Sequence, residues 1–273
     1  MFNKKNCFCG FEIVMIPKII HYCWVGNKEL PTLAKKCIAS WQRVMPEYEI
    51  KRWDETNYDF KKNEFMANAY ARKKWGFVPD YARLDIVYNY GGIYLDTDVE
   101  VLKSFDEFLK YPAFCGFESE HFIALGLGFG AQKGNKVIKQ LMEPYEKLDF
   151  KISDNILKQA SFYSKIQADK WQTQKTVPSP ILQTQYLVKH YGLKQNNTRQ
   201  SLQDMEVFPQ KYFCPKNQVN LPIKTKAAYS VHWYAASWLP WYYRVYFSLK
   251  KFASKILGKN YTYIYKIRKK FFK

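Results

Sequence analysis

The chain has 273 residues, a net formal charge of +19, 47% hydrophobic residues and 18% aromatic residues. This length predicts one large domain, alone or with appendages, and the hydrophobic content is enough for a sizeable core. The charge indicates an anionic partner, such as a nucleic acid, an anionic membrane or a phosphorylated substrate. No apolar run reaches the ~18 residues of a membrane-spanning helix. Six scattered cysteines without a C-x-x-C pair indicate reduced thiols in a cytosolic protein.

Residues 1–14 begin like a signal peptide, but Glu12 interrupts the apolar part and no small-residue cleavage site follows. We expect these residues to be an extension of the domain or a consequence of the choice of start site. The first strand is expected at Ile19–Val25, because its apolar residues are typical of a central parallel strand. Trp24 stands at the C-terminal end of this strand, where open α/β sheets bind ligands, so it is either a core residue or a ligand-binding residue. His21 is expected to pack in the core.

Hydrophobic spacing next predicts a helix at Leu30–Met45, a strand at Glu49–Trp53 and a helix at Asn63–Trp75. Asp54, just after the strand, is interpreted as a loop or cap carboxylate. Another helix is expected at Asp80–Tyr90, with Asp80 as its cap. Gly91–Gly92 ends this helix, because glycine adopts left-handed backbone geometry at low cost.

A short apolar strand at Ile93–Leu95 leads directly into the sequence Asp-Thr-Asp. Its two carboxylates, Asp96 and Asp98, repel each other unless a positive charge lies between them. A divalent cation with phosphate oxygens as further ligands suits such a pair, whereas the plainer alternative is an acidic turn after a strand. Asp80 and Arg83 share one face of the preceding helix, and this context favours the cation site.

The rest of the chain has less distinctive patterns. The segment His121–Gln132 is expected as a strand whose glycines, Gly126, Gly128 and Gly130, let a ligand or another backbone come close. Residues 147–175 are polar and are interpreted as a variable, partly helical insertion. The other expected elements are an edge segment at Val99–Leu102, a short helix at Phe105–Leu109, a strand at Ala113–Glu118, helices at Gly134–Tyr145 and Ile181–Tyr191, a strand and turn at Val207–Pro215, and a last strand at Ala228–Trp233.

Residues 239–273 differ from the rest, because they hold ten Lys or Arg residues and no Asp or Glu. Apolar residues of the first part fall on one helical stripe, which consists of Trp241, Val245, Leu249, Phe252 and Ile256. A basic amphipathic helix rich in aromatic residues is typical of a membrane-surface segment. The alternative is a C-terminal helix packed on the domain with a solvated basic face.

Three stretches, Ile16–Gly26, Phe77–Leu102 and His232–Trp238, together resemble glycosyltransferase family 32. This family includes capsular-polysaccharide synthesis proteins and fungal initiating mannosyltransferases, and the block is also similar to the glucosyltransferase domain of the large clostridial toxins. The resemblance implies a GT-A fold over residues 15–238, an α/β fold with a Rossmann-like mixed sheet flanked by helices. It also implies a nucleotide-sugar donor and a divalent metal, usually Mn²⁺ or else Mg²⁺.

The resemblance also implies roles for individual residues. Asp98 is the expected direct metal ligand, Asp96 binds the metal through water or holds donor hydroxyls, and His232 completes the metal site. The toxin relatives have a carboxylate in place of this histidine, and they place a Ser and a Trp against the diphosphate. Asp96, Asp98 and Arg83 are the expected catalytic residues. The expected donor-binding residues are Trp24, which would stack on uracil, and Asp80, Arg83, Tyr94, Asp96, Thr97, Ser237 and Trp238. The alternative for Asp80 and Arg83 is an ion pair on the helix surface.

The expected function is therefore retaining transfer of a sugar, with a UDP-sugar favoured as donor. The acceptor is expected to be a saccharide or lipid-linked saccharide in the synthesis of cell-surface polysaccharide, lipopolysaccharide or glycolipid. The tail would hold the enzyme on the cytoplasmic face of the cytoplasmic membrane. The alternatives are a basic nucleic-acid-binding protein and a non-catalytic membrane-surface protein. A nucleic-acid partner is not expected, because it leaves the Asp-Thr-Asp sequence unexplained.

Overall fold

The computed structural model describes residues 15–148, 178–215 and 226–235. Four predictions concern residues outside these ranges: the extension at 1–14, nearly all of the insertion at 147–175, the basic tail at 239–273, and the pair Ser237 and Trp238. They stay predictions.

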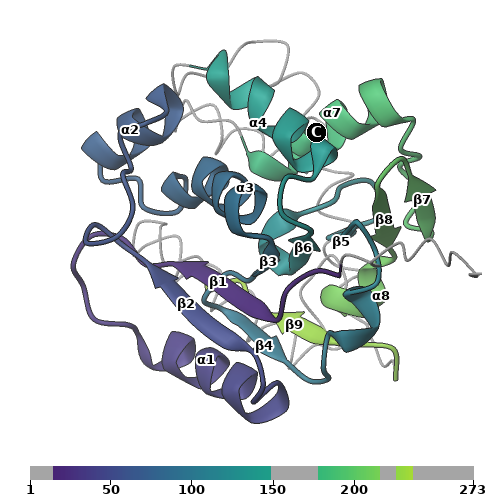
Figure 1. The fold of residues 1–273 in the computed structure, drawn as a ribbon, viewed down its shortest axis with the longest axis horizontal. Helices are drawn as coiled ribbons and strands as arrows, with labels where there is room; N and C mark the ends of the chain where they lie inside the picture. The colour runs from purple at the N-terminus through teal and green to yellow at the C-terminus, as the bar shows by residue number, and fades with distance from the viewer. Residues whose placement is uncertain (1–14, 149–177, 216–225, 236–273) are drawn as a thin grey trace, which may run out of the picture.

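Within the described residues, seven strands form one mixed sheet in the order β2-β1-β3-β6-β5-β8-β7 (Figure 1). β1 lies between β2 and β3 and is parallel to both. β6 is antiparallel to both β3 and β5, so β3 and β5 run in the same direction. The predicted α/β class with a mixed sheet is confirmed. The strands are β1 (Ile19–Cys23), β2 (Glu49–Trp53), β3 (Gly92–Tyr94), β5 (Ala113–Gly116), β6 (Phe129–Ala131), β7 (Gln200–Leu202) and β8 (Met205–Phe208).

Helices pack on both faces of this sheet, as Figure 1 shows. Successive residues of a strand point to opposite faces, so β3 contributes to two separate cores in the described part of the chain. Tyr94 packs in the core that contains α2, α3, α4 and α7, whereas Ile93 packs in the core that contains α1. The helices are α1 (Thr32–Val44), α2 (Glu64–Ala71), α3 (Val78–Tyr90), α4 (Lys136–Glu146), α7 (Ser179–Tyr191) and the short α8 (Gln210–Phe213). Two short 3-10 helices are η1 (Asp106–Phe108) and η2 (Leu125–Leu127).

A small antiparallel sheet joins the middle of the chain to its last described strand. β4 (Val99–Val101) pairs with β9 (Ser230–His232), and Val99 lies opposite His232. The predicted segment at Val99–Leu102 and the predicted last strand are therefore confirmed, although both are shorter than expected. Their pairing brings His232 next to the Asp-Thr-Asp sequence.

Two of the predicted helices differ from the structure. The helix expected at Asn63–Trp75 ends at Ala71, because the backbone of Lys73 is left-handed with a φ of 55°. The helix expected at Asp80–Tyr90 begins at Val78, so Asp80 lies in its first turn and is not its cap. Asp80 instead forms an ion pair with Arg83, with a distance of 3.0 Å between the carboxylate and the guanidinium.

The strand expected at His121–Gln132 is also wrong as a continuous element. η2 (Leu125–Leu127) interrupts it, and only β6 (Phe129–Ala131) joins the sheet. The backbone of Gly128, with a φ of 130°, separates the two pieces. The expectation that these glycines permit close contacts is confirmed at Gly130, where an added Cβ would lie 2.6 Å from the ring of Phe114.

His21 is a packing residue, as predicted. Its side chain is buried, Nε2 lies 2.8 Å from the carbonyl of Gly91, and Nδ1 accepts a hydrogen bond from Trp53 at 3.1 Å. Burial lowers the pKa of His21 to about 4, so the ring is neutral at physiological pH. Gly92 beside it has a φ of 100°, and an added Cβ would lie 2.7 Å from the carbonyl oxygen of Ile19. The predicted glycine turn after α3 is therefore confirmed.

None of the helices in the described ranges is long and apolar enough to cross a membrane. The cysteines of these ranges are free thiols, and all are buried, namely Cys23, Cys37, Cys115 and Cys214.

Candidate metal centre

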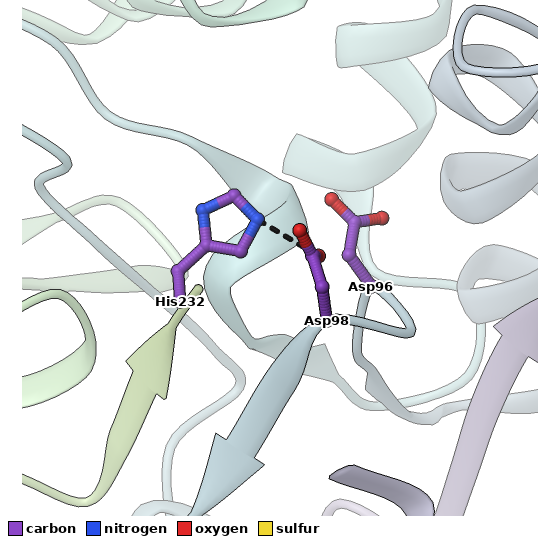
Figure 2. Close-up of side chains that lie close together, drawn as sticks. All are labelled: Asp96, Asp98 and His232. Atoms are coloured by element: carbon purple, nitrogen blue, oxygen red, sulfur yellow. Dashed lines mark hydrogen bonds and ion pairs between the residues drawn. The ribbon is translucent and has the colours of Figure 1, made fainter. Parts of the chain in front are cut away.

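The Asp-Thr-Asp sequence lies where β3 leaves the sheet. The amide of Leu95 donates to the carbonyl of His21 at 3.1 Å, so β1 and β3 end at the same edge. The chain then turns, because the amide of Val99 donates to the carbonyl of Asp96 at 3.0 Å. Figure 2 shows that this turn leaves the carboxylates of Asp96 and Asp98 side by side.

Asp98 is held by the segment that follows β9. His232 Nε2 lies 3.0 Å from Oδ1 of Asp98, and the amide of Ala235 donates to Oδ2 at 2.7 Å. The amide of Trp233 donates to the backbone carbonyl of Asp98 at 2.9 Å. These contacts follow from the register of β4 and β9, because Val99, the residue after Asp98, lies opposite His232.

Asp96, Asp98 and His232 form the one cluster of His, Cys, Asp and Glu side chains in the described ranges that has the geometry of a metal site. Each offers one ligand atom, and these atoms lie within 4.8 Å of one another (Figure 2). The side chains of Asp96, Asp98 and His232 are 28%, 17% and 14% exposed, so they remain open to solvent. Two carboxylates and one imidazole suit Mn²⁺ or Mg²⁺. The residues therefore fit the metal that the sequence predicts.

Electrostatics at this cluster also favour a cation. Burial alone would raise the pKa of Asp98, but the charge and hydrogen bond of His232, with the Ala235 amide, lower it to about 2. Burial alone would lower the pKa of His232, but the charge and hydrogen bond of Asp98, with smaller contributions from Asp96 and Glu118, raise it. The surrounding carboxylates thus hold positive charge at His232, as they would hold a metal ion.

Arg83 forms an ion pair with Asp96 and compensates the charge of its carboxylate. Its guanidinium lies 3.0 Å from Asp80 and 3.4 Å from Asp96, and its Nε donates to the carbonyl of Pro79 at 3.0 Å. The side chains of Arg83 and Asp80 are each only 6% exposed, so the ion pair is buried and is not a pair on the helix surface. Burial raises the pKa of Asp80 to about 7, although the charge of Arg83 opposes this rise. Arg83 therefore orients Asp96. The predicted contacts of Asp80 and Arg83 with a donor stay predictions.

Gly126 is a site residue whose role depends on having no side chain. Its carbonyl accepts a hydrogen bond from the amide of Asp96 at 3.0 Å. An added Cβ would lie 1.9 Å from Oδ2 of Asp96 and 2.9 Å from a guanidinium nitrogen of Arg83. Any larger residue at this position would displace the Asp96 carboxylate. The sequence predicts that a ligand or another backbone comes close to this glycine, whereas the group that does so here is the side chain of Asp96.

The other predicted donor-binding residues in the described ranges lie around the same sheet edge. Thr97 is half-buried in the turn between the two aspartates, and Trp24 is half-buried just after β1. The indole nitrogen of Trp24 donates to the carbonyl of Lys28 at 2.5 Å. Tyr94, in contrast, is 1% exposed, and its ring lies 5.1 Å from the guanidinium carbon of Arg83. Tyr94 thus packs against the guanidinium of Arg83 in the core and does not line the open site.

Glu118 lies near the cluster, although the sequence analysis did not single it out. It follows β5, which runs in the same direction as β3, so both strands end at the same edge. Burial raises the pKa of Glu118, while the charge of His232 and a hydrogen bond with Tyr234 lower it. No sequence motif marks this glutamate, and the strand order is the signal that brings it to the site.

Comparison with known proteins identifies the region that contains Arg83, Asp96 and Asp98. Residues 31–115 match the family model described as a glycosyltransferase sugar-binding region containing a DXD motif. Inositol phosphoceramide mannosyltransferase 3 of Schizosaccharomyces pombe is 33% identical over 147 residues, which are 50% of this chain and 38% of that protein. Mannosyl phosphorylinositol ceramide synthase SUR1 of Saccharomyces cerevisiae is 31% identical over 104 residues, which are 37% of this chain and 27% of that protein.

The chain spans well under half of the length of these two curated relatives. Among solved structures, the PaToxG glycosyltransferase shares 18% identity and a TM-score of 0.43, over 64% of this chain and 69% of that chain. The family model covers α3, β3 and the Asp-Thr-Asp sequence. Residues 31–115 thus resemble glycosyltransferase sugar-binding regions of the DXD type, which confirms the predicted resemblance to a DXD-type glycosyltransferase family.

Proposed function

We propose that this protein is a metal-dependent, retaining glycosyltransferase that moves a sugar from a nucleotide-sugar donor to an acceptor. The observation that carries the proposal is the cluster of Asp96, Asp98 and His232, whose ligand atoms lie within 4.8 Å of one another. This cluster stands at the edge of the sheet where β1 and β3 end, which is where open α/β sheets bind nucleotides. The match to a sugar-binding region supports a sugar nucleotide as the ligand.

A divalent cation held by these three residues would stabilise negative charge on the leaving diphosphate as a Lewis acid. The chain itself supplies orientation. Arg83 and Gly126 fix the carboxylate of Asp96, while His232 and the Ala235 amide fix that of Asp98. Such fixed groups cost little reorganisation when charge develops on the donor. We assign no protein group as general base.

The base of the donor is proposed to stack on Trp24. This side chain is half-buried at the end of β1, beside the strand that delivers Asp96. Uracil and guanine both have a face on which an indole can stack, and the resemblance to the toxin domain favours UDP. Mn²⁺ is proposed as the metal for the same reason.

Hydrolysis of a donor panel tests this function. The purified protein is incubated with UDP-sugars and GDP-sugars, once with Mn²⁺ and once with a chelator, and release of the nucleoside diphosphate is measured. We expect turnover of at least one donor with Mn²⁺ and none with the chelator. Equal turnover in the chelator, or no turnover of any donor in the panel, would contradict the proposal.

For the acceptor we propose a saccharide or lipid-linked saccharide in glycolipid or cell-surface polysaccharide synthesis, reached at the cytoplasmic face of the membrane. Both curated relatives are named for a ceramide product or substrate, which supports a lipid acceptor. The ten positive charges of residues 239–273 support attachment to an anionic surface, at ~1 kcal/mol for each Lys or Arg near it.

Co-sedimentation with liposomes tests the membrane proposal. The full chain should sediment with anionic liposomes at low salt, and neither neutral liposomes nor high salt should support this binding. A chain truncated after residue 238 should lose the binding and keep donor hydrolysis. A full chain that ignores anionic vesicles, or a truncated chain that unfolds, would show that the tail belongs to the domain.

A further inference from the structure

The four residues that follow Val231 wrap around Asp98. The His232 ring and the Ala235 amide each bind one carboxylate oxygen of Asp98. The amide of Trp233 binds the backbone carbonyl of Asp98. Trp233 and Ala235 thus donate to two different groups of one residue, its backbone carbonyl and its carboxylate. The chain turns between them at Tyr234, whose backbone is left-handed.

Tyr234 has an unusual backbone conformation for an aromatic residue. Its φ is 50°, which lies in the left-handed region, where a bulky side chain is an outlier. Residues strained in this way persist when the surrounding structure holds them, and they cluster at functional sites. The strain at Tyr234 turns the amide of Ala235 toward Asp98, so it has a direct consequence for the metal cluster.

The side chain of Tyr234 is anchored at both its ring and its hydroxyl. The ring lies 4.2 Å from the ring of His232, measured between centroids. The hydroxyl lies 2.9 Å from the thiol of Cys214. It also faces the carboxyl group of Glu118, whose pKa it lowers.

These anchors come from elements that are distant in sequence. Glu118 follows β5, Cys214 follows α8, and Tyr234 follows β9. We propose that Glu118, Cys214 and Tyr234 form a latch that holds His232 and Ala235 against Asp98 and so fixes the geometry of the metal site. The latch rests on the metal site of the proposed function. Glu118 and Tyr234 act through His232 and Ala235, so they are positioning residues and not metal ligands.

Substitution of the hydroxyl tests the latch with little change in packing. Tyr234→Phe keeps the ring against His232 and the left-handed backbone but removes both hydroxyl contacts, and Glu118→Gln keeps the shape of the acceptor while removing its charge. Each is compared with the wild-type full chain by Mn²⁺ titration followed by electron paramagnetic resonance, which reports binding without turnover. We expect the Kd for Mn²⁺ to rise about 10-fold or more in both variants, as in other sites that lose a supporting hydrogen bond. We also expect an altered spectrum of the bound ion.

A matched pair on the same segment provides the control. The hydroxyl of Tyr229 donates to Glu107 at 2.5 Å, before β9 begins and away from Asp98. Tyr229→Phe should lower the melting temperature about as much as Tyr234→Phe and leave Mn²⁺ affinity and its spectrum unchanged. Equal Mn²⁺ affinity in wild type and Tyr234→Phe would overturn the latch alone, as would an equal loss in Tyr229→Phe. A wild-type protein that binds no Mn²⁺ would overturn the metal site and the latch with it. If Tyr234→Phe fails to fold, Glu118→Gln decides by the same titration.

Discussion

His232 donates a hydrogen bond to Asp98 over a distance of 3.0 Å, although 134 residues separate the two in the sequence. His232 and Asp98, which share this proton, are also members of the cluster that would hold a divalent cation. Binding of the cation would therefore compete with the proton on His232. This relationship leads to the first prediction, which concerns pH.

Mn²⁺ affinity should rise with pH. Asp98 raises the pKa of His232 above its ordinary value of 6.5, so the metal must displace a proton from the imidazole. Below the raised pKa, affinity should increase about tenfold for each pH unit, because one proton leaves for each ion bound. Above the raised pKa it should level off. Calorimetric titration of Mn²⁺ across a pH series, with buffers of different ionisation enthalpy, measures both the affinity and the proton release.

His232→Gln provides the control for this pH effect. Glutamine keeps a ligand oxygen but does not titrate, so Mn²⁺ should bind more weakly and the rise of affinity with pH should disappear. The stability of the metal-free protein should depend on pH in the opposite direction from its Mn²⁺ affinity. The stabilisation that protonated His232 gains from Asp98 is present below 6.5 and is lost as the pH rises through the raised pKa. A wild-type affinity that is flat across this range would count against His232 as a ligand.

Gly126→Ala should disable the metal site and preserve the fold. The new Cβ would lie 1.9 Å from Oδ2 of Asp96, so the carboxylate must move away from Asp98 and His232. We expect Mn²⁺ affinity to fall about 10-fold or more. Thermal unfolding and Mn²⁺ titration of the same preparation separate loss of the site from loss of the fold.

Gly134→Ala is the matched glycine control. An added Cβ at Gly134 meets nothing within 4 Å, but its φ of 75° is left-handed. This variant should lose about 1 kcal/mol of unfolding free energy to backbone strain and bind Mn²⁺ like wild type. The reverse pattern, with Gly126→Ala binding normally, would show that Asp96 is not required in its present position.

Arg83→Met should destabilise the domain strongly. Removal of Arg83 leaves the Asp80 carboxyl buried without its partner, so it must either take up a proton or keep an uncompensated charge, which typically costs about 3 to 5 kcal/mol. The side chains of Arg83 and Asp80 are each 6% exposed, so solvent screens this pair little. Urea unfolding measures the loss, and the double variant with Asp80→Asn should recover part of it. Lys18→Met, which breaks an exposed pair with Glu47, should change stability only slightly. An equally small effect of Arg83→Met would contradict the structural role assigned to this arginine.

Trp24→Ala should weaken binding of the nucleoside diphosphate by ~1 to 3 kcal/mol, the range for stacking of a base on an aromatic side chain. Trp24→Phe keeps a face for stacking and should retain most of the affinity. Fluorescence or calorimetric titration with UDP and GDP in saturating Mn²⁺ measures the effect. A Trp24→Ala variant that loses stability but keeps its nucleotide affinity would show that Trp24 is a core packing residue and does not bind the base.

The two aspartates of the metal cluster could be predicted from the sequence pattern. Ile93–Leu95 is apolar and short, and the two aspartates follow directly, so their location at a sheet edge follows from the strand itself. His232 was expected at the site only through the resemblance of His232–Trp238 to glycosyltransferase family 32. The turn at Gly91–Gly92 after α3 could also be predicted, because glycine adopts left-handed backbone conformations at low cost.

The supporting residues could not be predicted, because their roles arise from contacts between distant segments. Gly126 matters through the carboxylate of Asp96, 30 residues earlier by the numbering of the chain. Glu118 and Tyr234 meet only after β5 and β9 reach the same edge. The spacing of Asp80 and Arg83 permits an ion pair on the helix surface, and only the structure shows that this pair is buried. The sequence therefore predicts residues that carry chemistry at strand ends, and the structure adds those that hold them in place.

The affinity of the protein for UDP and GDP, measured by calorimetry with and without Mn²⁺ in wild type and in Asp98→Asn, tests the central claim most directly. Asp98→Asn keeps the size of the side chain and the acceptor for the Ala235 amide while removing the charge, so the fold should persist. We predict that Mn²⁺ strengthens binding of one nucleotide to wild type at least tenfold, and that the variant binds it weakly whether or not Mn²⁺ is present. Wild-type binding that ignores Mn²⁺, or an Asp98→Asn variant that responds to Mn²⁺ as wild type does, would contradict the metal site proposed here.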